Sequence, residues 1–254
     1  MNINSNKVSV ITASFNSDRF IKETYQSIIA QEYTEWEWIV TDDCSSDGTV
    51  GILDAIAASD IRVKVIKNSV NLGAGFSRNK SMSQASGRFF AFIDADDLWE
   101  PQKLSRQVAF MLTGHIGFSF TSYRVIGQCG EDQGKVVDRG VPISVGYNDL
   151  LAKKATVGCS TVMVDRSLVG EFVMPGLRTG QDYVTWLSIL KRGFTGYLLK
   201  DTLTSYRIVE GSISRNKFKK ALRQWHIYRS SEELSFGLSV FYFFNYAIRA
   251  VVKK

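Results

Sequence analysis

Residues 89–97 of the chain read FFAFIDADD, an apolar run that ends in three carboxylates. A short apolar run with polar residues after it is typical of a strand that is buried on both faces of a parallel sheet. In such sheets, ligands bind beyond the carboxyl ends of the strands. The stretch therefore predicts an α/β fold and places Asp94, Asp96 and Asp97 at the edge where a ligand would bind.

The sequence around this run alternates short apolar segments with helical patterns, which predicts βαβ units and a mainly parallel central sheet flanked by helices. Strands are expected at residues 8–13, 36–41, 62–67, 89–93, 118–125, 160–164 and within 195–208. Helices are expected at 17–29 with Ser17 as cap, 50–58, 74–86, 101–112, 181–192 and within 217–254. With 254 residues, the chain is long enough for one large domain. We divide it into a domain of residues 1–214, whose halves meet near residue 112, and a helical tail of residues 215–254.

Three of the first four predicted strands end in polar residues, at 12–16, 42–43 and 94–97. Aspartate and asparagine also form turns and cap helices, so a single cluster of this kind has two interpretations. Three clusters at one edge of a sheet favour a ligand site. The pair Asp94 and Asp96, two positions apart, can share Mg²⁺ or Mn²⁺, which prefer carboxylate and phosphate oxygens.

Two common nucleotide-binding motifs are absent from the sequence. A dinucleotide fold needs G-x-G-x-x-G directly after a strand, whereas the turn at residues 12–17 has no glycine. The one G-x-G, at Gly73 and Gly75, has no third glycine in register, and no G-x-x-x-x-G-K-[ST] is present. Nicotinamide, flavin and P-loop enzymes are therefore excluded.

Several motifs follow one another in a fixed order. They are VSVITASFN at 8–16, VTDDCSSDGT at 40–49, NLGAGFSRN at 71–79, FIDADDLWEP at 92–101, GQDYVTWL at 180–187, YR at 206–207 and GSIS at 211–214. Each motif is short, but together and in this order they resemble family 2 glycosyltransferases of the GT-A fold, of the kind that build bacterial surface polysaccharides.

The resemblance implies a nucleotide site at the ends of the first strands. Asp43 would accept a hydrogen bond from the uracil imide, and the backbone of Ala13 and Ser14 would border the base. The remaining residues implied for the nucleotide are Asn16 in the first motif, Arg78 in the S-R-N match, and Asp94 beside the ribose and diphosphate.

The resemblance also implies the catalytic residues. Asp96 would ligate Mn²⁺ or Mg²⁺, and Asp182 would be the general base, with Trp186 one helical turn further on shaping the acceptor pocket. Inverting transfer requires a base for the attacking hydroxyl and stabilisation of the leaving diphosphate. On its own, Asp182 would equally suit the N-terminus of a helix. The loop at residues 206–214 would contribute Tyr206, Arg207, Ser212 and Ser214 to the acceptor side of the site.

The chain departs from the family pattern at two positions. Gln181 stands where the acceptor motif usually has Glu, and because we expect Asp182 to be the base, activity should survive. Val209 stands two residues after Arg207, where many relatives have a histidine, so a histidine ligand there is in doubt. His115 and His226 lie outside the motifs and are interpreted as structural.

The net charge of +6 is concentrated in the tail, where residues 215–254 hold nine Lys and Arg against two Glu. The rest of the chain is close to neutral, so a nucleic-acid partner is not expected. The segment 234–252 is rich in aromatic residues but contains Asn245 and Arg249. It fits attachment to an anionic membrane surface better than a spanning helix, and the alternative is a helix packed on the domain.

No secretion signal is visible at the N-terminus, and the three cysteines, Cys44, Cys129 and Cys159, are interpreted as free thiols of a reducing compartment. We expect an enzyme of the cytoplasm, peripheral on the inner face of the cell membrane. Its reaction would be inverting transfer of a sugar from a nucleotide-sugar, UDP-linked, to a hydroxyl of a lipid-linked oligosaccharide. The alternatives are a sugar-phosphate nucleotidyltransferase and a non-catalytic binding partner of the same fold.

Overall fold

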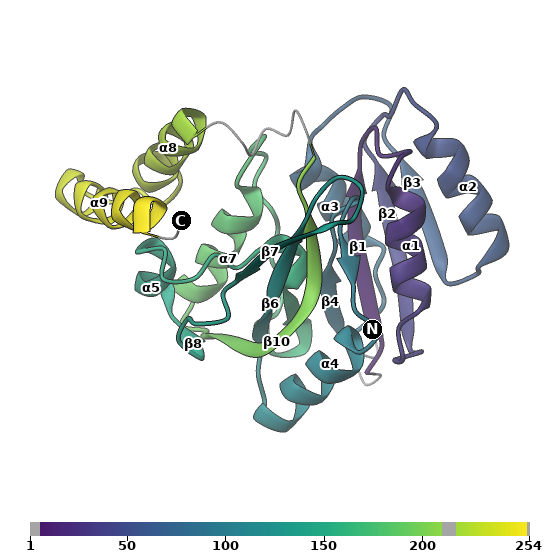
Figure 1. Cartoon of the computed structure of the whole chain (residues 1–254), viewed down its shortest axis with the longest axis horizontal. Coiled ribbons are helices and arrows are strands. Elements are labelled where there is room, and N and C mark those ends of the chain that lie inside the picture. The colour runs from purple at the N-terminus through teal and green to yellow at the C-terminus, as the bar shows by residue number, and fades with distance from the viewer. Residues whose placement is uncertain (1–5, 210–216, 253–254) are drawn as a thin grey trace.

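The apolar run at residues 89–92 forms β4, near the middle of a ten-stranded sheet (Figure 1). The structure is a computed structural model that describes residues 6–209 and 217–252. Its strands are β1 (Val8–Ser14), β2 (Trp36–Asp42), β3 (Val63–Lys67), β4 (Phe89–Phe92), β5 (Leu98–Trp99), β6 (Phe118–Ile126), β7 (Asp132–Val137), β8 (Ser144–Val145), β9 (Met163–Asp165) and β10 (Gly196–Arg207). The predicted long strands are confirmed.

The sheet is parallel on one side and mixed on the other. Its order is β3-β2-β1-β4-β9-β6-β10-β5, with β7 beside β6 and β8 beside β10. The pairs β2–β3, β1–β2, β1–β4 and β6–β10 are parallel, and β9 runs antiparallel between β4 and β6. The expected parallel arrangement thus holds for β1 to β4 and is interrupted by one short reversed strand. The carboxyl ends of β1, β2 and β4 share one edge.

Helices cover both faces of the sheet (Figure 1). They are α1 (Ile21–Ile29), α2 (Thr49–Ser59), α3 (Ala74–Ser83), α4 (Lys103–Gly114), α5 (Tyr147–Leu151), η1 (Cys159–Thr161), α6 (Arg166–Val169), α7 (Gln181–Lys191), α8 (Lys217–His226), η3 (Ile227–Ser231) and α9 (Phe236–Val252). Residues of α1, α2 and α4 are buried in one core, and residues of α3, α5 and α7 in the other. Strand side chains alternate between the two cores, as Trp38 and Ile39 do.

The first helix begins later than predicted. Ser17 does not cap α1 with its side chain, because its hydroxyl donates to the Phe15 carbonyl instead. The Ser17 carbonyl accepts from the backbone N–H groups of Phe20 and Ile21, which forms the turn that leads into the helix. The cap prediction is therefore wrong, although a helix does follow.

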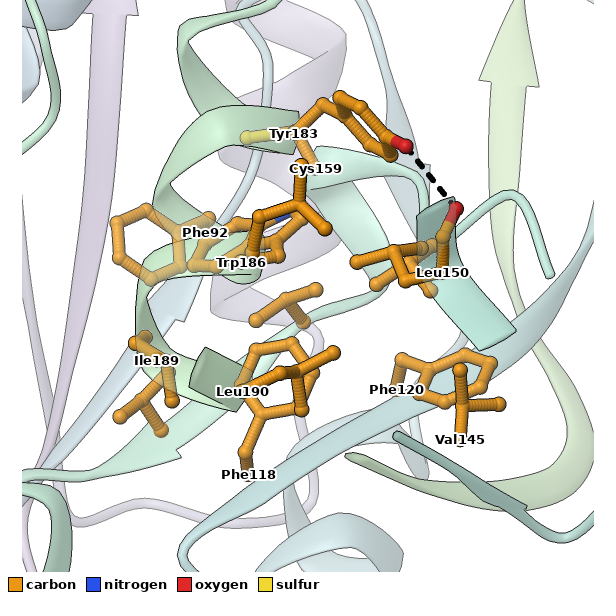
Figure 2. Close-up of a cluster of buried hydrophobic side chains, with 14 of the residues drawn as sticks. Phe92, Phe118, Phe120, Val145, Leu150, Cys159, Tyr183, Trp186, Ile189 and Leu190 are labelled. Carbon is orange, nitrogen blue, oxygen red and sulfur yellow. Dashed lines mark hydrogen bonds between the residues drawn. The ribbon is translucent and has the colours of Figure 1, made fainter. Parts of the chain in front are cut away.

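Aromatic packing fixes α7 on the sheet (Figure 2). Trp186 is fully buried, and its ring centroid lies 5.3 Å from that of Phe92 on β4 and 5.4 Å from that of Phe118 on β6. One turn earlier, the Tyr183 hydroxyl donates to the Leu150 carbonyl of α5 at 3.0 Å. Aromatic pairs of this kind contribute about 0.5–1.5 kcal/mol each beyond the area they bury. They hold the start of α7, and with it Asp182, in one place.

The C-terminal helices pack on the domain through α5 and α7. The Tyr228 hydroxyl donates to the Leu151 carbonyl at 2.6 Å, the Tyr147 hydroxyl to Glu232 at 2.6 Å, and the Tyr242 hydroxyl to Asn148 at 3.0 Å. Ile227, Tyr228 and Tyr242 are part of the same core as Trp186. Figure 1 shows α8 and α9 together at the side of the molecule away from α1 and α2. In residues 6–209 and 217–252, no helix has both the length and the apolar character to cross a membrane.

The outer face of α9 is apolar and exposed. Phe236, Val240, Phe244 and Ile248 recur every four residues with exposed fractions of 67%, 45%, 65% and 45%, and Phe241 beside them is 58% exposed. A four-residue spacing places these side chains on one face of a helix. We call these five residues the α9 apolar face. The three cysteines are free thiols, as predicted, with Cys159 buried and the other two exposed.

Candidate active site

The loops after β1 and β2 are joined by hydrogen bonds. The Ser14 hydroxyl donates to Asp42 at 3.1 Å, and Asp42 also accepts from the Ser45 backbone N–H at 2.9 Å. Asn16, exposed and at φ 47°, accepts from the Ser46 N–H at 2.9 Å. Cys44 likewise has a positive φ, of 65°. Strained backbone at two adjacent strand ends is typical of a functional site.

Asp43 connects the end of β2 to the start of α3. Its carboxylate accepts from the backbone N–H groups of Leu72 at 2.9 Å and Gly73 at 2.7 Å, and from the Asn68 amide at 2.8 Å. Burial alone would raise the pKa of Asp43, but these hydrogen bonds lower it below its usual value. Asp43 is thus held as a carboxylate at the edge predicted for the nucleotide.

Arg78 of α3 lies under the end of β4. Its Nη2 is 2.5 Å from the Asp94 carboxylate, and its side chain is only 5% exposed, against 30% for Asp94. Burial would lower the pKa of Arg78, but Cys159, Asp94 and Asp182 around it raise that pKa above its usual value. The Nε and Nη1 atoms are buried and have no partner within the described part of the chain. Buried donors without acceptors are rare in proteins, so they indicate a place for a ligand.

The two other carboxylates after β4 are more deeply buried. Burial and the neighbouring Asp94 raise the pKa of Asp96 to about 6. Burial, Asp96 and Asp94 raise the pKa of Asp97. The Asp97 carboxylate accepts from the Ser160 hydroxyl at 2.5 Å and from the Arg207 backbone N–H at 2.8 Å. Asp97 therefore connects β4 to β10.

Asp94 and Asp96 fit a divalent cation. Burial and Asp94 raise the pKa of Asp96, and a cation between the two carboxylates would remove their repulsion. In residues 6–209 and 217–252, no group of three or more His, Cys, Asp or Glu is placed to hold a metal ion, so a cation here would rest on the two carboxylates alone. Mg²⁺ and Mn²⁺ often keep one or two protein carboxylates and take their other ligands from substrate phosphates and water.

Asp182 and Asp94 line the same cavity, of about 540 Å³. Asp182 is in the first turn of α7, after Gly180, and is half-buried. Tyr206 near the end of β10 lines the cavity too, with Tyr123 of β6. The helix N-terminus favours the ionised form of a carboxylate. The fold therefore brings together the candidate base and the end of β4, from positions 88 residues apart in the sequence.

Known proteins resemble this chain over most of its length. The model of the family described as "Glycosyl transferase family 2" matches residues 9–170. TuaG of Bacillus subtilis, a glycosyltransferase assigned to teichuronic acid biosynthesis, is 43% identical over 97% of both chains. The chain belongs to glycosyltransferase family 2. The two WfgD and WfaP glucosyltransferases of Escherichia coli are 37% and 34% identical over 97% of this chain and 94% of theirs, and their names give UDP-Glc and α-D-GlcNAc-diphosphoundecaprenol as substrates.

Solved structures confirm the GT-A fold of this glycosyltransferase. S. aureus TarS residues 1–349, crystallised with UDP-GlcNAc, matches 88% of this chain with a TM-score of 0.69 at 22% identity, and the match covers 67% of TarS 1–349. The mannosyltransferase PcManGT of Pyrobaculum calidifontis, in complex with GDP-Man and Mn²⁺, matches 96% with a TM-score of 0.64 at 19% identity, over 64% of its chain. The predicted fold and enzyme class are both confirmed, and the nucleotidyltransferase and non-catalytic alternatives are not supported.

The predicted residues of this glycosyltransferase fall into two groups. Asp94, Asp182 and Tyr206 line the cavity. Ala13, Ser14, Asn16 and Asp43 lie at the ends of β1 and β2, outside the cavity lining, and are connected to it through α3 and Arg78. Ser212 and Ser214 lie outside the described residues.

Two predicted site residues have other positions than expected. Trp186 does not shape a pocket, because it is fully buried between α7 and the sheet and does not line the cavity. Arg207 belongs to β10 rather than to a loop, and its guanidinium donates to Glu23 at 2.7 Å and to the Asp96 and Gln128 carbonyls at 2.8 and 2.9 Å. Both residues hold elements in place. His115, at the C-terminal end of α4, and His226 line none of the cavity, which agrees with a structural interpretation.

The sequence analysis missed the basic side of the cavity. Lys153 lines it from the segment after α5, and Lys220 and Arg223 line it from α8. The analysis counted the two α8 residues only as part of a basic tail. Their spacing with Gln224 and Ile227, at positions 220, 223, 224 and 227, is the signal that could have found them, because it defines one face of a helix.

Proposed function

We propose that the chain is an inverting glycosyltransferase that transfers a sugar from a UDP-sugar to a hydroxyl of a lipid-linked saccharide during surface polysaccharide assembly. The observation that carries the proposal is the cavity shared by Asp94, at the end of β4, and Asp182, at the start of α7. It offers a base on one side and a diphosphate-binding strand end on the other.

Asp182 would act as the general base. A carboxylate oxygen accepts the proton of the acceptor hydroxyl while that oxygen attacks the anomeric carbon, opposite the departing diphosphate. One displacement inverts the configuration and needs no covalent nucleophile. The packing of Trp186 and Tyr183 holds α7 rigid, and so keeps the carboxylate at a fixed distance from the donor.

Arg78 would receive the leaving diphosphate. Its buried Nε and Nη1 are donors without a protein acceptor among the described residues, and Asp94 fixes the plane of the guanidinium. A planar guanidinium forms paired hydrogen bonds with phosphate oxygens. Asp96, with Asp94 beside it, would hold Mn²⁺ or Mg²⁺, which when bound supplies positive charge for the leaving diphosphate.

The ends of β1 and β2 would bind the nucleoside. The carboxylate of Asp43 makes three hydrogen bonds within the protein, and its oxygens can accept more, such as one from a uracil imide. Ser14 and Asn16 shape the adjoining loops, and the half-buried Ala13 lies next to them. The name UDP-Glc in WfgD and WfaP, and UDP-GlcNAc in the TarS structure, support a uridine donor.

The acceptor would be a saccharide on a lipid diphosphate. The WfgD and WfaP names state such an acceptor, and TuaG is assigned to a cell-wall polymer. The α9 apolar face, with Arg249 at its end, supports peripheral attachment to the inner face of the cell membrane. We retain residues 1–214 as the transferase domain and residues 215–254 as its membrane-facing part.

The central test is Asp182→Asn, which keeps the shape of the side chain but removes the base. A thermal-shift screen of nucleotide-sugars with Mn²⁺ first identifies the donor, because a ligand of the native state raises the melting temperature. We expect a UDP-sugar to give the largest shift. Transfer to a GlcNAc-diphospholipid acceptor should then fall by about 10²–10⁴-fold in Asp182→Asn, with unchanged affinity for UDP.

The matched control is Asp54→Asn on α2, an exposed aspartate paired with Lys67. It removes the same charge and should leave transfer unchanged. Transfer at the wild-type rate in Asp182→Asn would refute the assignment of the base. A product that retains the anomeric configuration of the donor would refute the inverting mechanism.

A further inference from the structure

The catalytic cavity has a basic side that the transfer mechanism does not use. Lys220 and Arg223 line it from α8, one helical turn apart. They line it together with Asp94 and Asp182, and Arg223 lies beside Gly180, the residue before α7. Gln224 and Ile227 continue the same helical face, whereas Phe218 and Leu222 point outward with exposed fractions of 72% and 55%. Lys220 and Arg223 are thus on the face of α8 that lines the cavity, whereas Lys219 is exposed.

Arg223 is packed against the start of α7. A Cβ on Gly180 would lie 3.1 Å from Cδ1 of Ile227, 3.3 Å from Cδ of Arg223 and 3.5 Å from its Nε, so the Arg223 side chain packs closely on Gly180. Gly180 has φ +80°, a conformation that favours glycine independently. Asp182 follows two residues later. The guanidinium therefore lies within reach of a molecule whose hydroxyl contacts the base.

The charges at this place are unfavourable without an anion. The N-terminus of α7 carries a partial positive charge, and a cation beside it is destabilising. The Arg223 Nε is buried and has no partner among the described residues. Burial, Arg223 and Lys135 all lower the pKa of Lys220. Two cations near a helix N-terminus, in a cavity with room for a ligand, form an anion site.

We propose that Lys220 and Arg223 bind the diphosphate of the lipid-linked acceptor. This inference rests on the proposed function, since it assigns a second diphosphate in the same cavity as the donor. The acceptor diphosphate carries two negative charges, which match two cations, and the planar guanidinium suits phosphate oxygens. The lipid would leave the cavity along α8 toward α9, which lies beside α8 (Figure 1) and carries the α9 apolar face.

The test measures binding of octyl diphosphate by calorimetry, with the donor site filled by UDP and Mn²⁺. Wild type should bind the probe, and the double variant Lys220→Gln/Arg223→Gln should bind it at least tenfold more weakly. The matched control is Lys219→Gln, which removes one charge from an exposed position of the same helix outside the cavity lining, and should bind as wild type does. Octyl glucoside, which has no phosphate, should show no difference among the three proteins.

Titration of UDP separates the two possible diphosphates. Equal UDP affinity in all proteins, together with the loss of octyl diphosphate binding, supports the acceptor assignment. A tenfold loss of UDP affinity in the double variant would assign the cations to the donor and overturn the proposal, as would unchanged binding of octyl diphosphate.

A further variant covers the case in which the double variant does not fold. Arg223→Lys keeps the charge but loses the planar donor pair, and should weaken octyl diphosphate binding severalfold with an unchanged melting temperature. Wild-type affinity in Arg223→Lys and in Lys220→Gln would overturn the proposal. Failure of the proposed function has a different signature, because wild type would then bind octyl diphosphate but transfer no sugar.

Discussion

Arg78 Nη2 lies 2.5 Å from Asp94 Oδ1, and this ion pair joins α3 to the carboxyl end of β4. The start of α3 is held by Asp43 from β2, so the helix connects the nucleotide edge to the catalytic cavity. The pair is buried on the arginine side and open on the aspartate side. One contact thus serves both stability and the placement of a carboxylate that lines the cavity.

A double-mutant cycle should show that Arg78 and Asp94 are strongly coupled. In Asp94→Asn the buried guanidinium loses its counter-charge. We expect this loss to lower the free energy of unfolding by about 3 kcal/mol, the lower end of the range for removing one partner of a buried ion pair. Arg78→Met should also destabilise, and the double variant should be more stable than the sum of the two effects predicts, by about 1–3 kcal/mol. Urea unfolding measures all four proteins, and additive effects would contradict the coupling.

Gly75 is the closest approach between α3 and the segment before α7. A Cβ there would lie 2.6 Å from the Pro175 carbonyl oxygen and 3.4 Å from the Gln181 side chain. Gly75→Ala should therefore push the two segments apart, lower the free energy of unfolding by about 1–3 kcal/mol and reduce sugar transfer. Thermal unfolding and the transfer assay measure the two effects.

Gly51→Ala on α2 is the control for this substitution. A Cβ at Gly51 would meet nothing within 4 Å, and its helical backbone suits alanine. The variant should gain about 0.5–1 kcal/mol of stability and transfer sugar normally. If Gly75→Ala were as stable and active as Gly51→Ala, α3 and the Pro175 segment would not be in tight contact.

The sequence predicted the nucleotide half well because local signals agree there with the final structure. The apolar runs of β1, β2 and β4 are buried strands, and the polar residues that follow them lie at one sheet edge, whereas β3 at the end of the sheet is partly exposed. The position of Asp94 and Asp96 directly after β4 follows from the apolar run before them. Asp182 was found through the motif around it, and its position beside Asp94 depends on a contact between distant segments.

The remaining errors come from tertiary contacts. Trp186 was predicted to face the cavity but lies in the core. An aromatic side chain one helical turn after Asp182 can face either place, and helical spacing does not distinguish the two. A strand was predicted at residues 160–164, but β9 covers only Met163–Asp165, and its antiparallel direction between β4 and β6 has no signal in the sequence. The spacing of Lys220 and Arg223 puts them on one face of α8. Only the packing of α8 against Gly180 shows that this face, and not that of the other cations of the tail, lines the cavity.

Lys103 should reduce the stability of the enzyme at neutral pH. Its side chain is fully buried, its Nζ lies 4.0 Å from the centre of the Trp99 ring, and this atom has no hydrogen-bond partner in the described part of the structure. Burial lowers the pKa of Lys103 well below its usual range. Lys103→Met should therefore raise the free energy of unfolding at pH 7 by about 1–3 kcal/mol.

The advantage of Lys103→Met should shrink as the pH rises. Below the pKa of an unfolded lysine, about 10.4, the unfolded wild type binds one more proton than the folded protein, so the wild type gains stability with increasing pH. Urea unfolding of both proteins between pH 7 and 10 measures the difference. The exposed Lys22→Met is the control and should show no such trend. A constant difference between Lys103→Met and wild type would mean that Lys103 stays charged in the fold.

Attachment to the membrane should depend on the α9 apolar face. Phe241→Asp/Phe244→Asp replaces two exposed aromatic rings by carboxylates, and removes apolar contact with lipid while adding repulsion from anionic head groups. Flotation with vesicles of phosphatidylglycerol and phosphatidylethanolamine should show binding at least about tenfold weaker than wild type, since burying one such ring contributes roughly 1.5–3 kcal/mol.

Ile61→Asp, at a fully exposed position between α2 and β3, is the matched control and should float as wild type does. Because the basic residues of the tail contribute electrostatically, high salt and phosphatidylcholine vesicles should also weaken wild-type binding. Equal flotation of the α9 variant and wild type would show that this face does not enter the membrane surface.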